Sequence, residues 1–325
     1  MAKFLIIGDV HYRVEDESDC QLLIDRIRSM VDAGGVDRVV FLGDEFHNHS
    51  IVRTEALLFW RQALLSFSSE SCPAWLLVGN HDRPGDASSG SHALLAFKDM
   101  AHVLVIDEPV TCGGTLWLPY YHDNQEFIRI CQQFQGFSSL FCHQEFFGTD
   151  LNGGFYSKTG VDPAAIPQTQ VLGGHIHTPQ KFGKVWYPGA PRWLQAGDAN
   201  QDRSIYLVVV DDETGAIVGT PEAIPSPCSH RWHLVDAETA PVDPDFKPGD
   251  RYSVDLVGSQ AWIEARRPLW AGNAKVRAVR TDSQQVRVRE SEGLAQALSR
   301  WVHGYKPAGG TSAQVLEEMV RARLG

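Results

Sequence analysis

Apolar residues in the first eighty positions follow two different spacings. Continuous apolar runs at 3–8, 37–42 and 75–78 are typical of strands that are covered on both faces. Between them, segments 19–33 and 52–66 carry apolar residues at helical spacing, and two glycines end the first of these segments. This alternation of strands and helices predicts parallel strands joined by crossover helices.

From residue 102 onward the apolar runs become shorter and more frequent. We predict strands at 103–106, 115–118, 139–142, 170–172, 184–187 and 204–210, followed by a hairpin into 216–218. Short helices are predicted at 91–97 and 124–134. Two packed sheets with helices outside each would account for this mixture, so we expect an α/β fold.

A proline-rich stretch separates these elements from the rest of the chain. Residues 221–250 contain six prolines and are interpreted as a connector with one edge strand at 230–235. We expect a large domain at 1–225, a connector at 226–250, a small α+β domain at 251–303 and a C-terminal helical segment at 304–325. Strands are predicted at 252–257, 274–279 and 286–289, and helices at 292–303 and 312–323. The apolar stripe of the last helix either packs on its own domain or docks onto a partner.

Polar side chains follow five of the predicted strands. The segments are Gly8-Asp9-Val10-His11, Gly43-Asp44-Glu45-Phe46-His47, Gly79-Asn80-His81-Asp82, Cys142-His143 and Gly174-His175-Ile176-His177. Each motif alone is commoner as a turn, a helix cap or a buried histidine. Because open α/β sheets place their sites at the carboxyl ends of strands, the five together predict one site.

Seven of these residues supply metal-binding atoms: two carboxylates, four imidazoles and one amide oxygen. They are Asp9, His11, Asp44, Asn80, His143, His175 and His177. Mixed nitrogen and oxygen donors suit manganese, iron(II) or zinc better than calcium or magnesium. Seven donors are too many for one ion, whereas two ions about 3.5–4 Å apart with a bridging carboxylate fit the number. In an extended chain the rings of His175 and His177 would point to one side, and each would serve a different ion.

The net charge of −11 conceals an asymmetry between the two parts of the chain. Residues 1–250 hold 17 Lys and Arg against 33 Asp and Glu, and residues 251–325 hold 12 against 7. An acidic N-terminal part is expected if several of its carboxylates bind cations. The basic C-terminal part would bind phosphates or an acidic partner, and the alternative is that these charges form ordinary solvated surface.

Cysteine usage and hydropathy bear on the cellular compartment. The six cysteines are scattered without a C-x-x-C pair, which favours reduced thiols over a disulfide framework or a zinc cluster. No apolar run approaches the roughly 20 residues that span a bilayer, and the first residues lead directly into a strand rather than a signal peptide. We expect a soluble protein of the cytoplasm, in a bacterial or phage-infected cell, with no membrane partner.

The order of the five motifs resembles that of the calcineurin-like metallophosphoesterases over residues 4–190. The resemblance implies a two-sheet β sandwich flanked by helices and two divalent metal ions, Mn²⁺ first, with Fe²⁺, Zn²⁺ or Mg²⁺ as alternatives. It places one ion among Asp9, His11, Asp44 and His177. It places the other among Asp44, Asn80, His143 and His175, so that Asp44 bridges the two.

A narrower resemblance is carried by residues 174–180, by residues 186–191 and by the small C-terminal domain. These segments are similar to those of SbcD-type nuclease subunits of SbcCD repair and recombination complexes from bacteria and phages. The resemblance implies an exonuclease on double-stranded DNA and an endonuclease on single-stranded DNA. It also implies a homodimer whose C-terminal helices bind an SbcC-like coiled-coil ATPase subunit.

Catalytic roles follow from the same resemblance. His81 would protonate the leaving group, Asp82 or another carboxylate would keep His81 protonated, and His47 would position the phosphate. A local basic path for DNA is expected from residues close to the motifs in sequence, namely Arg83, Arg192, Lys181 and Lys184. A phosphatase, or a phosphodiesterase acting on cyclic nucleotides or other small molecules, on the same centre is the main alternative, and a non-catalytic scaffold is a second.

Overall fold

The computed structural model describes residues 1–49, 51–85, 90–151, 154–195, 198, 200–227, 229–236, 245–246 and 250–281. The chain divides into two compact units. The first comprises Met1–Trp232 with Asp245–Ser253, and the second comprises His233–Pro244 with Val254–Gly325. The predicted strand at 286–289 and the predicted helices at 292–303 and 312–323 lie outside the described residues.

The first sheet confirms the strand and helix alternation read from the front of the chain. Its strand order is β12-β11-β1-β2-β3-β4, and β1 to β4 pair in parallel. The parallel strands are β1 (Ala2–Ile7), β2 (Arg38–Phe41), β3 (Ala74–Leu77) and β4 (Val103–Ile106). Helices α1 (Glu17–Asp32) and α2 (Thr54–Phe67) bury their apolar stripes in one cluster with this sheet. Strands β11 (Ser204–Val210) and β12 (Ile217–Pro225) complete it in antiparallel pairing.

The second sheet has the order β5-β6-β7-β8-β10-β9. Its strands are β5 (Val110–Cys112), β6 (Thr115–Leu118), β7 (Ser139–His143), β8 (Gln170–Gly174), β9 (Gln180–Phe182) and β10 (Val185–Tyr187). Helix α3 (Asn124–Gln133) packs on it through Phe127, Ile130 and Cys131. β5 and β9 are three-residue strands that the apolar pattern did not reveal.

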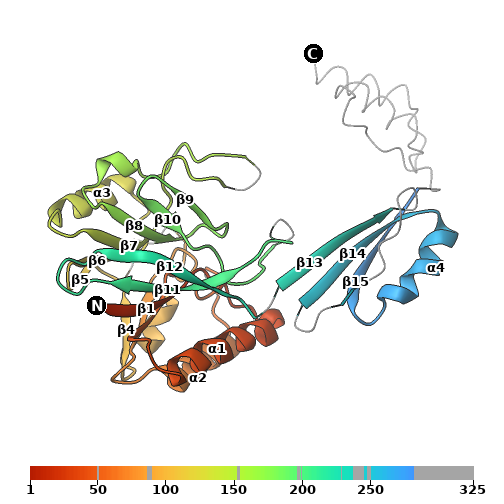
Figure 1. Cartoon of the computed structure of the whole chain (residues 1–325), viewed down its shortest axis with the longest axis horizontal. Helices are drawn as coiled ribbons and strands as arrows, with labels where there is room; N and C mark the ends of the chain where they lie inside the picture. Colours follow the sequence, from red (N-terminus) through yellow and green to blue (C-terminus); the bar gives the residue numbers. More distant parts are fainter. Residues whose placement is uncertain are drawn as a thin grey trace, which may run out of the picture. The chain divides into compact units, whose positions relative to one another are not determined.

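The two sheets pack face to face, with α1 and α2 on one outer side and α3 on the other (Figure 1). Aromatic side chains fill the space between them. The Trp117 and Phe141 rings stack at 4.1 Å between centroids, and Phe4 of the first sheet lies 6.0 Å from Trp117. Each such ring buries about 150–250 Å² when it is fully enclosed. The expected two-layer β sandwich flanked by helices is confirmed.

Two segments differ from the sequence prediction. β12 continues to Pro225, so residues 221–225 form a strand instead of the start of a connector. β12 lies at the edge of its sheet, where a proline costs no hydrogen bond with a neighbouring strand. The short helix predicted at 91–97 is the 3-10 helix η2 (Ala93–Phe97), and two further 3-10 turns are η1 (Val14–Asp16) and η3 (Pro163–Ala165).

The remaining described elements form a three-stranded sheet with one helix. The strand order is β13-β14-β15, with β13 (Ser229–Asp236), β14 (Asp250–Gly258) and β15 (Ala274–Arg280). The helix α4 (Gln260–Trp270) was missed because Pro268 argues against a helix, although Ser259 caps its start by accepting from the Trp262 N–H. Among the described helices, none is long and apolar enough to cross a bilayer.

Candidate metal centre

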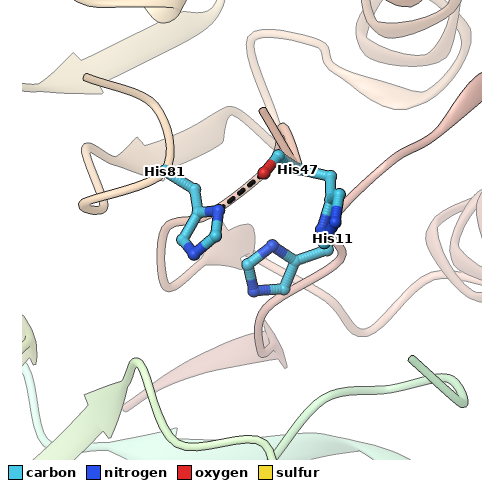
Figure 2. A group of neighbouring side chains, drawn as sticks. All are labelled: His11, His47 and His81. Carbon is cyan, nitrogen blue, oxygen red and sulfur yellow. Dashed lines mark hydrogen bonds between the residues drawn. The ribbon is translucent and has the colours of Figure 1, made fainter. Parts of the chain in front are cut away.

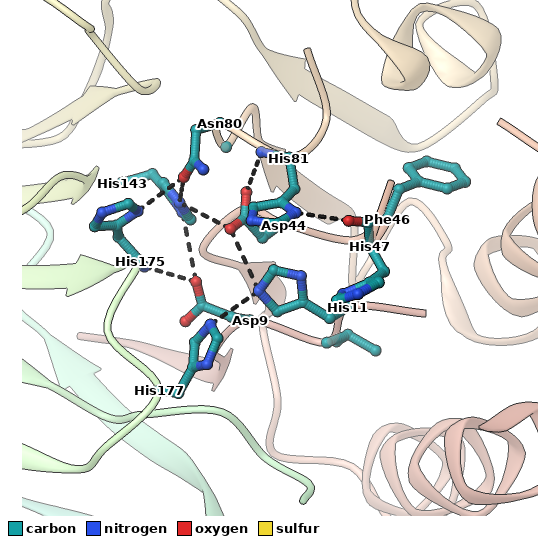
Figure 3. A network of polar contacts seen from close by, with 12 residues as sticks. Asp9, His11, Asp44, Phe46, His47, Asn80, His81, His143, His175 and His177 are labelled. Carbon is teal, nitrogen blue, oxygen red and sulfur yellow. Dashed lines mark hydrogen bonds and ion pairs between the residues drawn. The ribbon is translucent and has the colours of Figure 1, made fainter. Parts of the chain in front are cut away.

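The seven predicted metal ligands converge where strands of both sheets end (Figure 3). The ends of β1, β2 and β3 in the first sheet supply Asp9, His11, Asp44 and Asn80. The ends of β7 and β8 in the second sheet supply His143, His175 and His177. Parallel strands within each sheet bring their carboxyl ends to one edge, and packing of the sheets brings the two edges together.

One group of donors surrounds His11. The Nε2 atom of His11 lies 3.0 Å from Nε2 of His177 and 3.4 Å from Oδ2 of Asp44. Asp9, His11 and His177 each offer a ligand atom, and these atoms lie within 4.8 Å of one another. Asp9 is fully buried, and its Oδ2 has no hydrogen-bond partner among the described residues. A buried carboxylate oxygen of this kind requires a positive partner.

A second group surrounds Asn80. The Oδ1 atom of Asn80 lies 3.0 Å from Nε2 of His143 and 2.8 Å from Nδ1 of His175. Oδ2 of Asp44 lies 3.4 Å from Nε2 of His143, so the same carboxylate oxygen faces both groups. Asp44, His143 and His175 offer ligand atoms within 4.8 Å of one another. The geometry therefore matches two adjacent cation sites that share Asp44.

The charge state of these groups supports cation binding. Burial disfavours a proton on His143, but the negative charges of Asp44 and Asp9 outweigh it and raise the pKa of His143 to about 9. Burial lowers the pKa of His11 well below its usual range. The two carboxylates thus favour positive charge in this cluster. The mixed donor set and this demand for positive charge fit two divalent transition-metal ions.

Three of the donors stand on left-handed backbone. The φ angles are 48° at His11, 58° at Asp44 and 88° at His175. Such conformations cost about 1–3 kcal/mol each in non-glycine residues and concentrate at functional sites. The turn at His175 also corrects the expectation of an extended chain there. His175 and His177 do reach different donor groups, but a sharp turn separates them instead of strand alternation.

Gly79 is required by the close approach of two strand ends. A Cβ atom at this position would lie 2.2 Å from Oδ1 and 2.5 Å from the backbone nitrogen of Asp44. Any side chain would therefore displace the shared carboxylate.

Asp82 has a different place from the one expected. It is buried, and its carboxylate accepts the backbone N–H groups of Asp44, Gly79 and Phe46 at 2.9, 2.8 and 3.1 Å. With its oxygens occupied by these amides, it holds the ends of β2 and β3 together. The prediction that Asp82 keeps the His81 ring protonated is not supported, because the described partner of that ring is the His47 carbonyl.

His81 stands beside the donor groups with three other histidines around it. Its backbone N–H donates to Oδ1 of Asp44 at 2.8 Å, and its Nδ1 lies 2.6 Å from the His47 carbonyl oxygen (Figure 2). Its ring meets that of His11 edge to face at 4.5 Å, with the His47 ring 5.5 Å from His11. The exposed His49 ring lies 3.8 Å from His81, a neighbour that sequence reasoning did not assign to the site.

Two of the four residues predicted to contact DNA are placed elsewhere. Arg192 is 1% exposed and donates to the carbonyls of Val10 and His11, with an ion pair to Asp16 at 3.1 Å. It therefore ties the loop after β1 and cannot reach a phosphate. Lys184 donates to a backbone carbonyl, that of Ile166, at 2.7 Å. It precedes β10, which pairs in parallel with the start of β8, whereas the donors follow the end of β8.

The other two cations differ in exposure. Lys181 is exposed on β9, and Arg83 is half-buried. Burial lowers the pKa of Arg83, with Tyr121 as its largest opposing neighbour.

Two carboxylates of the site region were not predicted. Glu45 is fully buried, and burial together with the neighbouring Asp82 raises its pKa well above the usual range. Glu145 lies 3.9 Å from Nε2 of His175, on the opposite side of the ring from Asn80, and Tyr120 stacks on the same ring at 5.8 Å. A carboxylate behind a metal-binding imidazole orients the ring and raises its basicity. Its position two residues after His143 was the available signal.

Comparison with known proteins agrees with this geometry. A family model described as calcineurin-like phosphoesterase matches residues 2–179. A protein of Invertebrate iridescent virus 6, named "Putative phosphoesterase 244L", is 26% identical over 276 residues, which cover 79% of this chain and 94% of the viral one. "Putative phosphoesterase 078R" of Invertebrate iridescent virus 3 is 28% identical over 223 residues, which cover 64% of this chain and 63% of the viral one.

Proposed function

The chain belongs to the calcineurin-like phosphoesterase family, and we propose that it is a manganese-dependent nuclease that hydrolyses phosphodiester bonds in DNA. The observation that carries the hydrolytic part is the pair of donor groups sharing Asp44, with His81 beside them. The step to DNA rests on the similarity of residues 174–180 and 186–191 to SbcD-type subunits.

The metal assignment follows the two groups of donors. Asp9, His11, Asp44 and His177 would hold one ion, and Asp44, Asn80, His143 and His175 would hold the other. Two divalent cations there would lower the pKa of a water molecule and neutralise charge on the phosphate oxygens.

His81 is placed to act as the general acid. Its Nδ1 donates to the His47 carbonyl, which fixes the ring and leaves Nε2 to deliver a proton to the departing oxygen. Its backbone N–H holds Oδ1 of Asp44, so the acid and the shared carboxylate are positioned together. The His47 side chain, half-buried beside His11, would contact the phosphate.

The partners of the proposed nuclease follow from the same similarity. We propose a homodimer that binds an SbcC-like coiled-coil ATPase through the C-terminal segment, in the cytoplasm. Lys181 and Arg83 are the remaining candidates for phosphate contacts near the centre. The expected contribution of residues 282–325 lies outside the described part of the chain.

A phosphatase or small-molecule phosphodiesterase uses the same centre and is the second candidate. The family description and the names of both viral relatives specify phosphate esters without a substrate, which favours neither candidate. The half-buried His81 and the exposed His49 near the centre admit a polymer as readily as a small ester.

A substrate panel tests the proposal. Purified protein with Mn²⁺ is given linear duplex DNA, circular single-stranded DNA, bis-p-nitrophenyl phosphate, p-nitrophenyl phosphate and a cyclic nucleotide. We expect cleavage of both DNAs and of the diester, no cleavage after chelation, and DNA cleavage slowed about 10²- to 10⁴-fold in the His81→Ala variant. Rapid hydrolysis of the monoester or the cyclic nucleotide with intact DNA would identify the second candidate.

A further inference from the structure

The segment between β7 and β8 exposes an unusual number of large apolar side chains. Phe147, Leu151, Phe155 and Tyr156 are 53%, 47%, 76% and 62% exposed. We call these four residues the aromatic loop. Large apolar groups gathered on a surface mark an interaction site more often than chance.

Hydrogen bonds tie the described residues of this segment. The backbone N–H of Gly148 donates to the Ser157 carbonyl at 3.0 Å, and that of Leu151 donates to the Phe155 carbonyl at 2.7 Å. Gln180 of β9 anchors the loop, because its amide accepts from the Asp150 N–H and donates to the Asp150 carbonyl, both at 2.9 Å. The fold thus holds these side chains in solvent.

One member of the aromatic loop, Leu151, borders the metal centre. Leu151 and Asp150 line a hollow of about 170 Å³ together with His175, His177 and Glu145. His175 and His177 come from the two different donor groups, so this hollow opens on both proposed ion sites.

We propose that the aromatic loop is a platform on which unpaired nucleobases stack while the phosphate between them lies in the metal centre. This inference rests on the proposed nuclease function and assigns single-stranded ends as the preferred substrate. Proteins that bind single strands combine aromatic faces with cations that follow the backbone. The exposed Lys158 follows the loop aromatics, and the exposed Lys181 is adjacent to Gln180, so both components are present.

Binding of single strands with and without bases tests the platform. Chelated protein is titrated with a labelled oligothymidylate and with an abasic oligonucleotide of the same length, at one salt concentration. We expect wild type to prefer the oligothymidylate. In the double variant Phe155→Ala, Tyr156→Ala we expect oligothymidylate affinity to fall about tenfold or more and abasic affinity to stay unchanged, since each stacked base contributes severalfold or more. The variant Phe155→Trp is expected to keep the preference.

Two controls separate the platform from folding and from the proposed chemistry. Leu65→Ala removes an apolar side chain that is 60% exposed on α2 and should leave binding of both oligonucleotides unchanged. Hydrolysis of bis-p-nitrophenyl phosphate with Mn²⁺ should be equal in wild type and in the double variant. Equal affinity of wild type for the two oligonucleotides, or an unaltered preference in the double variant, would overturn the platform. Equal binding of the two oligonucleotides by wild type would contradict the platform alone. Absence of diester cleavage by wild type would contradict the proposed hydrolytic function, so the two failures can be distinguished.

Discussion

The two sheets bring different chemistry to the metal centre. The first sheet supplies both carboxylates of the predicted ligand set, Asp9 and Asp44, together with an amide and one imidazole. The second sheet supplies three imidazoles and no carboxylate to this set. The electrostatic attraction for cations therefore comes mainly from the first sheet, and the second completes the coordination with nitrogen atoms.

This division shows how the centre depends on the packing of the sheets. The face between them is apolar where Trp117 and Phe4 meet, and it becomes polar only at the edge where the strands end. Neither sheet alone holds all the donors of either group, because His177 completes the group of His11 and His143 completes the group of Asn80. Cations bound there would join the sheets.

Removing the shared carboxylate should have the largest effect. Asp44→Asn takes one negative charge from both groups, so we expect loss of both ions and a fall in diester hydrolysis of about a thousandfold or more. His143→Ala removes one nitrogen donor of the second sheet and should leave one ion. Metal content per chain after dialysis measures the difference, and an Asp44→Asn protein that retains two ions would contradict the division.

The next effect separates metal binding from proton transfer within the first sheet. His81→Ala should lower the rate of DNA cleavage about 10²- to 10⁴-fold while the protein keeps its metal content, because the role proposed for the ring is that of an acid. The neighbouring exposed His49 offers the matched variant His49→Ala, which should change the rate little. Loss of metal together with activity in His81→Ala would show that the ring is a ligand.

Arg192 is a polar link between the sheets, since it follows β10 of the second and donates to carbonyls after β1 of the first. Arg192→Met leaves the carbonyls of Val10 and His11 without this donor, whereas Asp16 keeps Arg13 at 2.7 Å, so we expect a loss of about 2–4 kcal/mol in the free energy of unfolding, measured by urea denaturation. Lys181→Met should leave that free energy unchanged and lessen the salt dependence of DNA binding. An Arg192→Met protein of normal stability but weak DNA binding would instead support the prediction that Arg192 contacts DNA.

On the second sheet, the Glu145 carboxylate should tune one ion site only. Glu145→Gln removes the charge behind His175, and we expect affinity for the ion of that group to fall about 10- to 100-fold. Titration calorimetry with Mn²⁺ should show the other site unchanged. Glu126→Gln, an exposed carboxylate on α3, provides the control. Equal weakening of both sites would point to a general loss of structure.

The smallest expected effect is a pH dependence of protein stability, which arises from His92 near the first sheet. Burial lowers the pKa of His92, against the opposing attraction of Asp107 at 3.2 Å. Below a pH of about 6.5 the unfolded chain takes up a proton that the folded chain resists, so the stability of the protein falls as the pH decreases. Thermal melts of the chelated protein between pH 7 and 5 should show this slope, and His92→Gln should reduce it. A slope that is the same in both proteins would exclude His92 as a source.

Much of the fold could be read from the chain because the signals are local. Buried parallel strands are apolar throughout, and α1 and α2 repeat apolar residues at helical spacing, so the order of elements follows from the residues alone. Three-residue strands such as β5 and β9 have too few positions to show a pattern. Helix α4 was not predicted, because a proline such as Pro268 usually indicates the end of a helix.

The candidate site was predicted as a set of residues, but their environment was not. Asp9, His11, Asp44 and the other donors follow strand ends, and strand ends are visible in the sequence. The sequence does not show whether a charged side chain near such a motif faces solvent or the interior. Asp82 belongs to a motif and Arg192 directly follows residues 186–191, yet both are buried, because backbone carbonyls and amides from distant segments surround them.

The sequence by itself determined which residue types stand at the ends of which strands, and with them the family and the kind of chemistry. Only the tertiary structure decided that Asp44 faces both donor groups, that Glu145 stands behind His175 and that Leu151 of the aromatic loop borders the centre. The physical reason is that element order depends on neighbours along the chain. The distance between two side chains depends on how elements far apart along the chain pack, as at His11 and His177, which are 166 positions apart.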